Sequence, residues 1–257
     1  MKTFLNPKDL PLAAGLMGIG GALLRLLAAL LATDRRGLIQ QGHILVILLW
    51  AVTALTVLLV TLPVRQLGGS RKYNLNFSAS KAAAFGCGVM ALCVMVTAAF
   101  SLERSGLGYL RYGLGLAAGS CLIFLAYGRF RGIHVSFLFH CVVCVFFAIH
   151  MVSRYRVWSG DPQLLNYVFE VFASVGLMLF AYQQAAFEVG LGKRRTQLWL
   201  GLMSGYFCLV SLPGVSYPLL YLGGAVWTLT NLCTLTPPPR RKRAAPEAPR
   251  QKTNETA

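Results

Sequence analysis

Residues 158–190 read WSGDPQLLNYVFEVFASVGLMLFAYQQAAFEVG, which predicts a membrane-spanning helix with one polar side. Asp161 and Pro162 mark its start, because the carboxylate accepts hydrogen bonds from free N–H groups and proline is tolerated at the first helical position. Several positions share a sector of roughly 60° around the helix axis: Asn166, Glu170, Leu177, Ala181, Gln184 and Glu188. Such a polar stripe has to face other protein or water, because lipid cannot solvate it.

The composition predicts an all-α, polytopic membrane helix bundle. Hydrophobic residues make up 56% of the chain and charged residues 12%, against about 25% charged residues in soluble domains. The net charge of +16 would favour nucleic acid as a partner of a soluble protein. Here most basic residues lie between apolar runs, where they set topology and meet anionic lipids, so we expect no nucleic-acid binding.

Apolar runs recur along the chain and predict about eight transmembrane helices. The last run, residues 197–235, would be about 58 Å long as one helix, too long for a hydrocarbon core about 30 Å thick. Pro213 and Gly214 near its middle form a turn signal, so we divide it in two. The expected spans are residues 11–32, 43–62, 82–101, 106–127, 133–152, 162–190 and the two halves of 197–235.

These spans form one predicted membrane domain, residues 11–235, between a cytoplasmic lead (1–10) and a Pro-rich, basic tail (236–257). We expect the tail to be disordered and to contact anionic lipids. Of the 24 Lys and Arg residues, 17 lie on the side of the two termini and 5 on the other. By the positive-inside rule both termini are cytoplasmic, and the protein lies in the cell membrane.

Charged residues inside the spans are the candidate site. From the helix rise, Glu170, Arg111 and Arg25 lie about 8–12 Å below the outer boundary, and His140 lies near the midplane. The candidate ligand-binding or buried polar residues are Arg25, Arg111, His140, Asn166, Glu170 and Gln184. We expect Glu170 to face Arg111 or Arg25, either in a hydrated cavity that binds a solute or as a pair that locks two helices together.

The segment after the fifth predicted span is rich in basic and aromatic residues. Arg154, Arg156 and Trp158 form a predicted outer mouth that attracts anions towards the buried charges. The same aromatic residues also fit the belt that anchors spanning helices at the membrane interface.

The sequence carries no catalytic, cofactor or metal-binding motif that we can identify. The HExxH, GxSxG and Walker patterns are absent. Cys141 and Cys144 have the spacing of a metal or redox pair, but zinc needs four ligands and no second pair follows. We therefore expect no cofactor, and the sequence does not argue for an enzyme.

Two classes of function fit these features. The first is a small solute permease, or a solute-binding membrane protein, with a polar cavity in the outer half of the membrane. The alternative is a non-transporting membrane sensor or assembly component whose buried charges are structural. The pairs Gly115/Gly119 and Gly201/Gly205 permit close helix packing within the chain or in a homo-oligomer, so they fit both classes.

Four segments of the second half of the chain are similar to segments of other membrane proteins: RYRVWSGDPQLLNYVFE, AAFEVGLGKRR, CLVSLPG and WTLTNLCTL. They resemble uncharacterised polytopic integral membrane proteins of anaerobic Gram-positive bacteria. The resemblance covers about the last 110 residues, and the first half mainly by hydropathy. It implies a bacterial cytoplasmic membrane protein and brings with it no activity, substrate or catalytic residue.

Overall fold

The computed structural model describes residues 9–32, 40, 42–66, 73–100, 106–160 and 167–235. These residues form helices and connecting turns, with no strand among them apart from an isolated bridge between Phe77 and Leu235. The helices are α1 Leu10–Leu31, α2 Ile44–Gln66, α3 Tyr73–Asn76, α4 Lys81–Phe100, α5 Gly106–Arg131, α6 Phe137–Trp158, α7 Val168–Glu188, α8 Arg194–Ser211 and α9 Pro218–Cys233. The predicted all-α class is confirmed.

Six of the helices, α1, α2, α4, α5, α6 and α7, are long and apolar enough to cross a membrane. Their outward faces carry large apolar side chains, such as Leu30 and Ile44, which are 70% and 75% exposed. A soluble protein rarely exposes a continuous apolar surface of this kind, whereas lipid covers it without cost. The chain is thus a multi-pass membrane protein.

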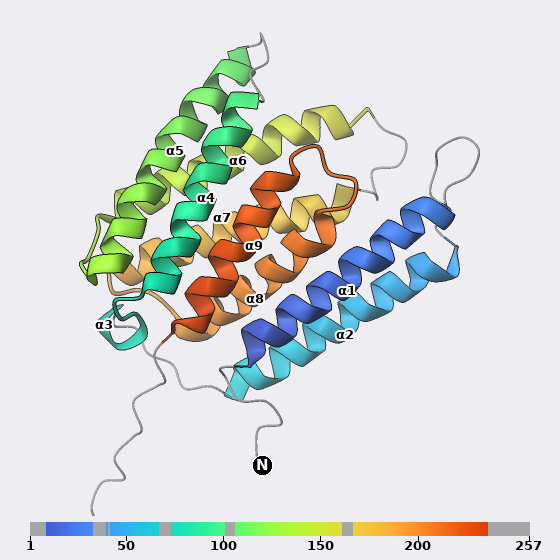
Figure 1. Ribbon diagram of the computed structural model, residues 1–257, viewed down its shortest axis with the longest axis horizontal. Coiled ribbons are helices and arrows are strands. Elements are labelled where there is room, and N and C mark those ends of the chain that lie inside the picture. Colours follow the sequence, from blue (N-terminus) through green and yellow to red (C-terminus); the bar gives the residue numbers. More distant parts are fainter. Residues whose placement is uncertain are drawn as a thin grey trace, which may run out of the picture.

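The helices lie in a bundle with α8 and α9 in its middle (Figure 1). The α1–α2 hairpin packs on α8, and the α4–α5 hairpin packs on α9 and α6. Helix α7 lies between α6 and α8, so its polar stripe faces the interior. This placement buries Glu170, Ser174, Leu177, Ala181 and Gln184.

The two central helices, α8 and α9, have 18 and 16 residues and are shorter than the six apolar helices. Helix α8 is also more polar than those six. Their surroundings explain this, since α8 packs against α1, α2, α7 and α9. A helix shielded from lipid on most sides tolerates polar residues that a lipid-facing helix does not. The predicted division of residues 197–235 is confirmed, with Gly214 in the turn at a positive φ of 88°.

Close helix contacts are made at small residues, as the predicted glycine pairs indicate. A Cβ on Gly115 would lie 2.5 Å from the Cβ of Ala98, so α5 approaches α4 where only glycine fits. A Cβ on Gly201 would similarly meet Phe180 and Leu232 within 2.8 Å. Both pairs therefore serve packing within the chain.

Some predicted boundaries were wrong. Helix α6 begins after Ser136, whose side chain accepts from the N–H of Leu138, and runs to Trp158, six residues beyond the predicted end at Val152. Helix α2 continues through Pro63 to Gln66, because proline late in a helix removes a single N–H donor. The basic loop after α2 contains the short helix α3, which the sequence did not predict.

Several predictions lie outside the described residues. The Asp161–Pro162 helix start and Asn166 belong to residues 161–166, so the described part of α7 begins with Tyr167 as its N-cap. Most of the lead and the whole of the tail, residues 236–257, are also outside them.

Candidate functional site

Buried and half-buried charged and aromatic side chains meet where α5, α7 and α9 begin and α6 ends. We call this group the arginine–glutamate cluster. It consists of Arg25, Arg111, His150, Arg154, Glu170, Tyr217 and Tyr221, with Ser153, Ser174 and Ser216 beside them. The helices alternate in direction, so residues far apart in the sequence reach the same level of the bundle.

Glu170 lies at the centre of the cluster and is 1% exposed. Its Oε1 accepts from Arg154 Nε at 3.4 Å and from the Tyr221 hydroxyl at 3.2 Å. The Tyr221 hydroxyl lies 2.9 Å from Ser174 Oγ. Among the described residues, Glu170 Oε2 has no hydrogen-bond partner. The carboxylate is thus held through one of its two oxygens.

Arg154 is also buried and has partners other than Glu170. Its Nη2 donates to Ser216 Oγ at 2.7 Å, and its guanidinium lies 5.3 Å from the ring centres of both Trp158 and Tyr217. A cation within about 6 Å of an aromatic face is stabilised by the ring quadrupole. The continued α6 helix therefore turns Arg154 and Trp158 into the bundle, and only Arg156 of the predicted outer mouth is exposed.

Arg111 faces Tyr217 from the other side. Its Nη1 donates to Ser153 Oγ at 3.2 Å and its Nη2 to the Tyr217 hydroxyl at 3.3 Å. Its guanidinium carbon lies 5.4 Å from the centre of the Tyr217 ring. Tyr217 thus contacts two guanidinium groups, and α9 joins α5 to α6 through this residue.

Arg25 approaches from α1. It donates to the backbone oxygen of Val210 at 3.2 Å and lies 5.4 Å from the ring centre of Phe169, near enough to Glu170 for their charges to attract. The expected partner of Glu170 in an ion pair was Arg111 or Arg25, whereas the structure pairs it with Arg154 at 3.4 Å. Counting described residues, the cluster holds three guanidinium groups and one carboxylate.

The sequence reasoning missed His150, Tyr217 and Tyr221. The two tyrosines are four residues apart at the start of α9, hence on one face, and the His150 ring lies 5.8 Å and 6.5 Å from theirs. Their signal in the sequence is the pattern Tyr-Pro-x-x-Tyr, in which Pro218 begins the helix and places both tyrosines in its first turns.

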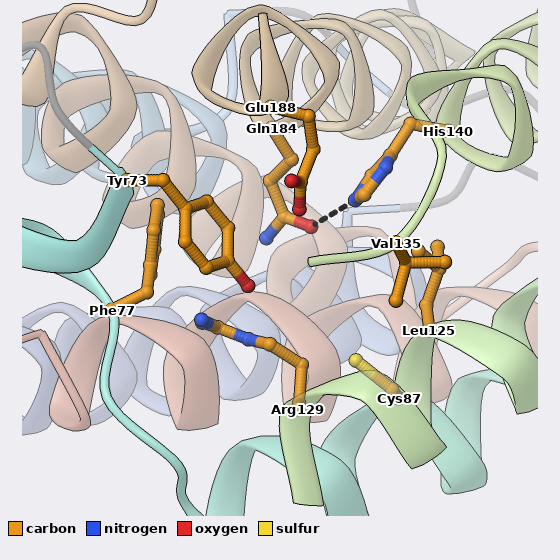
Figure 2. A pocket seen from close by; sticks show the side chains of 9 residues that line it. All are labelled: Tyr73, Phe77, Cys87, Leu125, Arg129, Val135, His140, Gln184 and Glu188. Atoms are coloured by element: carbon orange, nitrogen blue, oxygen red, sulfur yellow. Dashed lines mark hydrogen bonds between the residues drawn. The ribbon is translucent and has the colours of Figure 1, made fainter. Parts of the chain in front are cut away.

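His140 and Gln184 belong to a second polar group at the opposite end of the bundle (Figure 2). His140 Nε2 lies 3.2 Å from Gln184 Oε1, and both face a cavity of about 10 Å³, enough for about one water molecule. The hydrogen bond of His140 is with Gln184 and not with Glu170. The cavity is lined by Tyr73, Phe77, Cys87, Leu125, Arg129, Val135, His140, Gln184 and Glu188.

Arg129 fixes the floor of this cavity. It donates to Asn231 Oδ1 at 2.7 Å and lies 4.2 Å from the ring centre of Phe77. Glu188 Oε2 lies within hydrogen-bonding distance, 2.9 Å, of Nδ1 of His134, whose side chain is half exposed. Tyr73 contacts the His134 ring, and burial raises the pKa of its phenol. The short α3 helix therefore closes this end of the bundle.

An apolar layer separates the two polar groups. On α7, Glu170 and Gln184 are 14 residues apart, about 21 Å, and Leu177 and Ala181 between them are fully buried. The Phe180 ring meets Trp227 of α9 edge-on at 5.1 Å. The stripe predicted on α7 is therefore polar at its two ends and apolar in its middle.

No group of three or more His, Cys, Asp or Glu residues within the described part of the chain is arranged to hold a metal ion. All seven cysteines are free, and the Cys144 thiol contacts the backbone oxygen of Met178 instead of Cys141. In comparisons with known proteins, no family model, curated protein or solved structure matches the chain.

Proposed function

We propose that this protein is a permease of the bacterial cytoplasmic membrane that binds a small anionic solute at the arginine–glutamate cluster. In this proposal all eight long helices cross the membrane, with both termini in the cytoplasm and the cluster in the outer half. The central position of α8 and α9 supports the count, because helices inside a bundle need fewer apolar residues than lipid-facing ones.

One observation carries the proposal: charged side chains are buried together at membrane depth. Arg111 and Glu170 are 2% and 1% exposed, and Arg154 is 8% exposed. Charges buried in a membrane domain are costly and mark binding or transport sites more often than not. Because the described residues supply three guanidinium groups and one carboxylate, the field of the cluster favours an anion.

The geometry also supports an exchange of partners at Arg154. Its contact with Glu170 is 3.4 Å, longer than the roughly 2.7–2.9 Å of a strong charge-assisted hydrogen bond. Its bond to Ser216 is 2.7 Å. A solute carboxylate or phosphate can therefore take the place of Glu170 on Arg154 while Ser216 and the aromatic rings keep the guanidinium in position.

A non-transporting role, as a sensor or assembly component, is the second candidate. The observation that favours it is the Arg154–Glu170 pair, which joins α6 to α7. The arginines of the cluster also donate to oxygens of neighbouring helices, as Arg111 does to Ser153 and Tyr217. Such bonds lock a bundle whether or not a solute binds.

Anion-dependent thermal unfolding of the full chain in detergent tests the proposal. The sodium salts of acetate, lactate, glutamate, phosphate and sulfate are compared at equal ionic strength. An anion at 100 times its Kd stabilises the protein by about 2.7 kcal/mol, a rise in Tm of roughly 5–10 °C for a chain of this size. We expect the rise with one class of anion for the wild-type protein and none for Arg111→Gln.

The matched control is Arg131→Gln, which changes an exposed arginine of the same helix at its other end. We expect the Arg131→Gln variant to keep the anion-dependent rise in Tm of the wild-type protein. Uptake of the stabilising anion into proteoliposomes then separates a permease from a sensor. The proposal of solute binding is wrong if no anion of the panel raises the Tm, or if Arg131→Gln abolishes the response as completely as Arg111→Gln.

A further inference from the structure

A groove of about 480 Å³ opens on the surface of the bundle between α6, α7 and the start of α8. This volume lies in the range of roughly 300–1,000 Å³ typical of ligand sites. It is lined by Phe137, Cys141, Tyr182, Gln183, Ala185, Ala186, Val189, Leu191, Lys193 and Thr196. The groove shares no lining residue with the two polar groups described above, although helix α7 contributes residues to all three.

The walls of the groove are apolar and exposed. Tyr182, Val189 and Leu191 are 62%, 51% and 70% exposed. Tyr182 and Cys141 lie within the apolar helices α7 and α6, so this part of the groove faces lipid. Ala185 and Ala186 add small side chains to its lining. Such a surface fits the acyl chain of a lipid.

One end of the groove is polar and basic. Lys193, which is exposed, and Thr196 line it where the chain enters α8, and Arg195 beside them is also exposed. The turn is fixed in place, because Gln183 Nε2 donates to the backbone oxygen of Lys193 at 3.2 Å. The N–H of Leu191 donates to Ala186 at 2.8 Å, closing the end of α7.

We propose that this groove is a binding site for one anionic phospholipid. The acyl chain lies along Tyr182 and Ala186, and the phosphate meets Lys193 and Thr196. Basic pockets between spanning helices on the cytoplasmic side are suited to anionic headgroups, and the loop charges predict that this end of the bundle is cytoplasmic. The site does not depend on the proposed permease function, since it lies outside the arginine–glutamate cluster.

A lipid fits better than a soluble ligand or a peptide for two reasons. The groove opens towards the region that lipid occupies, so a soluble molecule would have to displace lipid to enter it. Its charged side chain, Lys193, also lies at one end, beside Thr196 and Gln183, which matches a molecule with one charged end and one apolar end. A peptide would leave its backbone N–H and C=O groups without partners against the apolar walls.

Lipid retention measured by native mass spectrometry on the full chain tests the site. The probes are phosphatidylglycerol and phosphatidylcholine with the same acyl chains, each titrated into detergent-purified protein. We expect the wild-type protein to bind phosphatidylglycerol more tightly. Lys193→Ala weakens that binding about fivefold, the loss of one basic contact at a lipid surface, and weakens phosphatidylcholine binding less, because the choline cation offsets the charge of the phosphate. Arg131→Ala, an exposed arginine outside the groove, changes neither.

Filling the groove provides the second arm. Ala186→Trp abolishes retention of both lipids, and Cys141→Phe does the same from the α6 side, so that one misfolded variant does not decide the result. Circular dichroism checks that each variant keeps its helices. Equal binding of the two lipids by the wild-type protein, or an equal loss in Lys193→Ala and Arg131→Ala, overturns the proposal. So does unchanged retention in both filled variants.

Discussion

Removing the charge of Glu170 is the most direct test of the arginine–glutamate cluster. Glu170→Gln keeps the shape of the side chain and an acceptor for the Tyr221 hydroxyl, but it leaves Arg154 buried beside a neutral amide. Breaking a buried ion pair by removing one partner costs about 3–5 kcal/mol. We expect a loss in this range because Glu170 and Arg154 are 1% and 8% exposed.

A double-mutant cycle separates this pair from its surroundings. Arg154→Met also loses the bond to Ser216 and the contacts with Trp158 and Tyr217, but these losses appear in both arms and cancel. We expect Glu170→Gln and Arg154→Met to be coupled by about 2–3 kcal/mol, the upper part of the range for residues in contact. The double variant is then less destabilised than the sum of the two single variants.

The assay is equilibrium unfolding of the full chain in mixed detergent micelles, followed by circular dichroism. The matched control is Arg129→Met, a buried arginine at the other end of the bundle, whose effect should add to that of Glu170→Gln within about 0.5 kcal/mol. A coupling of Glu170 with Arg111 as large as that with Arg154 would refute the pairing described here. So would additive losses for Glu170 and Arg154.

Two further predictions concern packing and pH. Gly115→Val should destabilise the bundle by about 1–3 kcal/mol in the same unfolding assay, because its Cβ would overlap Ala98, whereas Gly113→Ala should not, because no atom lies within 4 Å of the added Cβ. Burial raises the pKa of Tyr73, so its contribution to stability is complete below about pH 10, the ordinary tyrosine value, and is lost above it. Tyr73→Phe should therefore flatten the loss of stability between pH 9 and 11 in a pH titration of unfolding, and an unchanged slope would contradict this.

The sequence predicted the helical class and most helices because apolar runs and turn residues are local signals. The turn at Gly214 and the polar stripe of α7 were also found this way, since both follow from short-range spacing. Helix ends were less predictable. Arg154 lies in a run of polar residues that is typical of a loop, and only its contacts with Glu170 and Tyr217 show why α6 continues through it.

The partners of the buried charges could not be predicted from helix rise alone. Rise places Glu170, Arg111 and Arg25 at similar depth, but the partner depends on how α5, α6 and α7 are rotated about their axes. That rotation is set by long-range packing, such as the contact of Gly115 with Ala98. For the same reason depth did not separate His140 from Glu170, which belong to polar groups about 21 Å apart along α7.

The apolar layer between Leu177 and Trp227 also has an electrical consequence. The membrane voltage falls mainly across regions of low polarisability, and the two polar groups lie about 21 Å apart along α7, against a hydrocarbon thickness of roughly 30 Å. A unit charge moving from one polar group to the other would therefore cross about two thirds of the voltage. At 100 mV that is roughly 1.6 kcal/mol, so the transfer of a charge between the two polar groups would depend on the membrane potential.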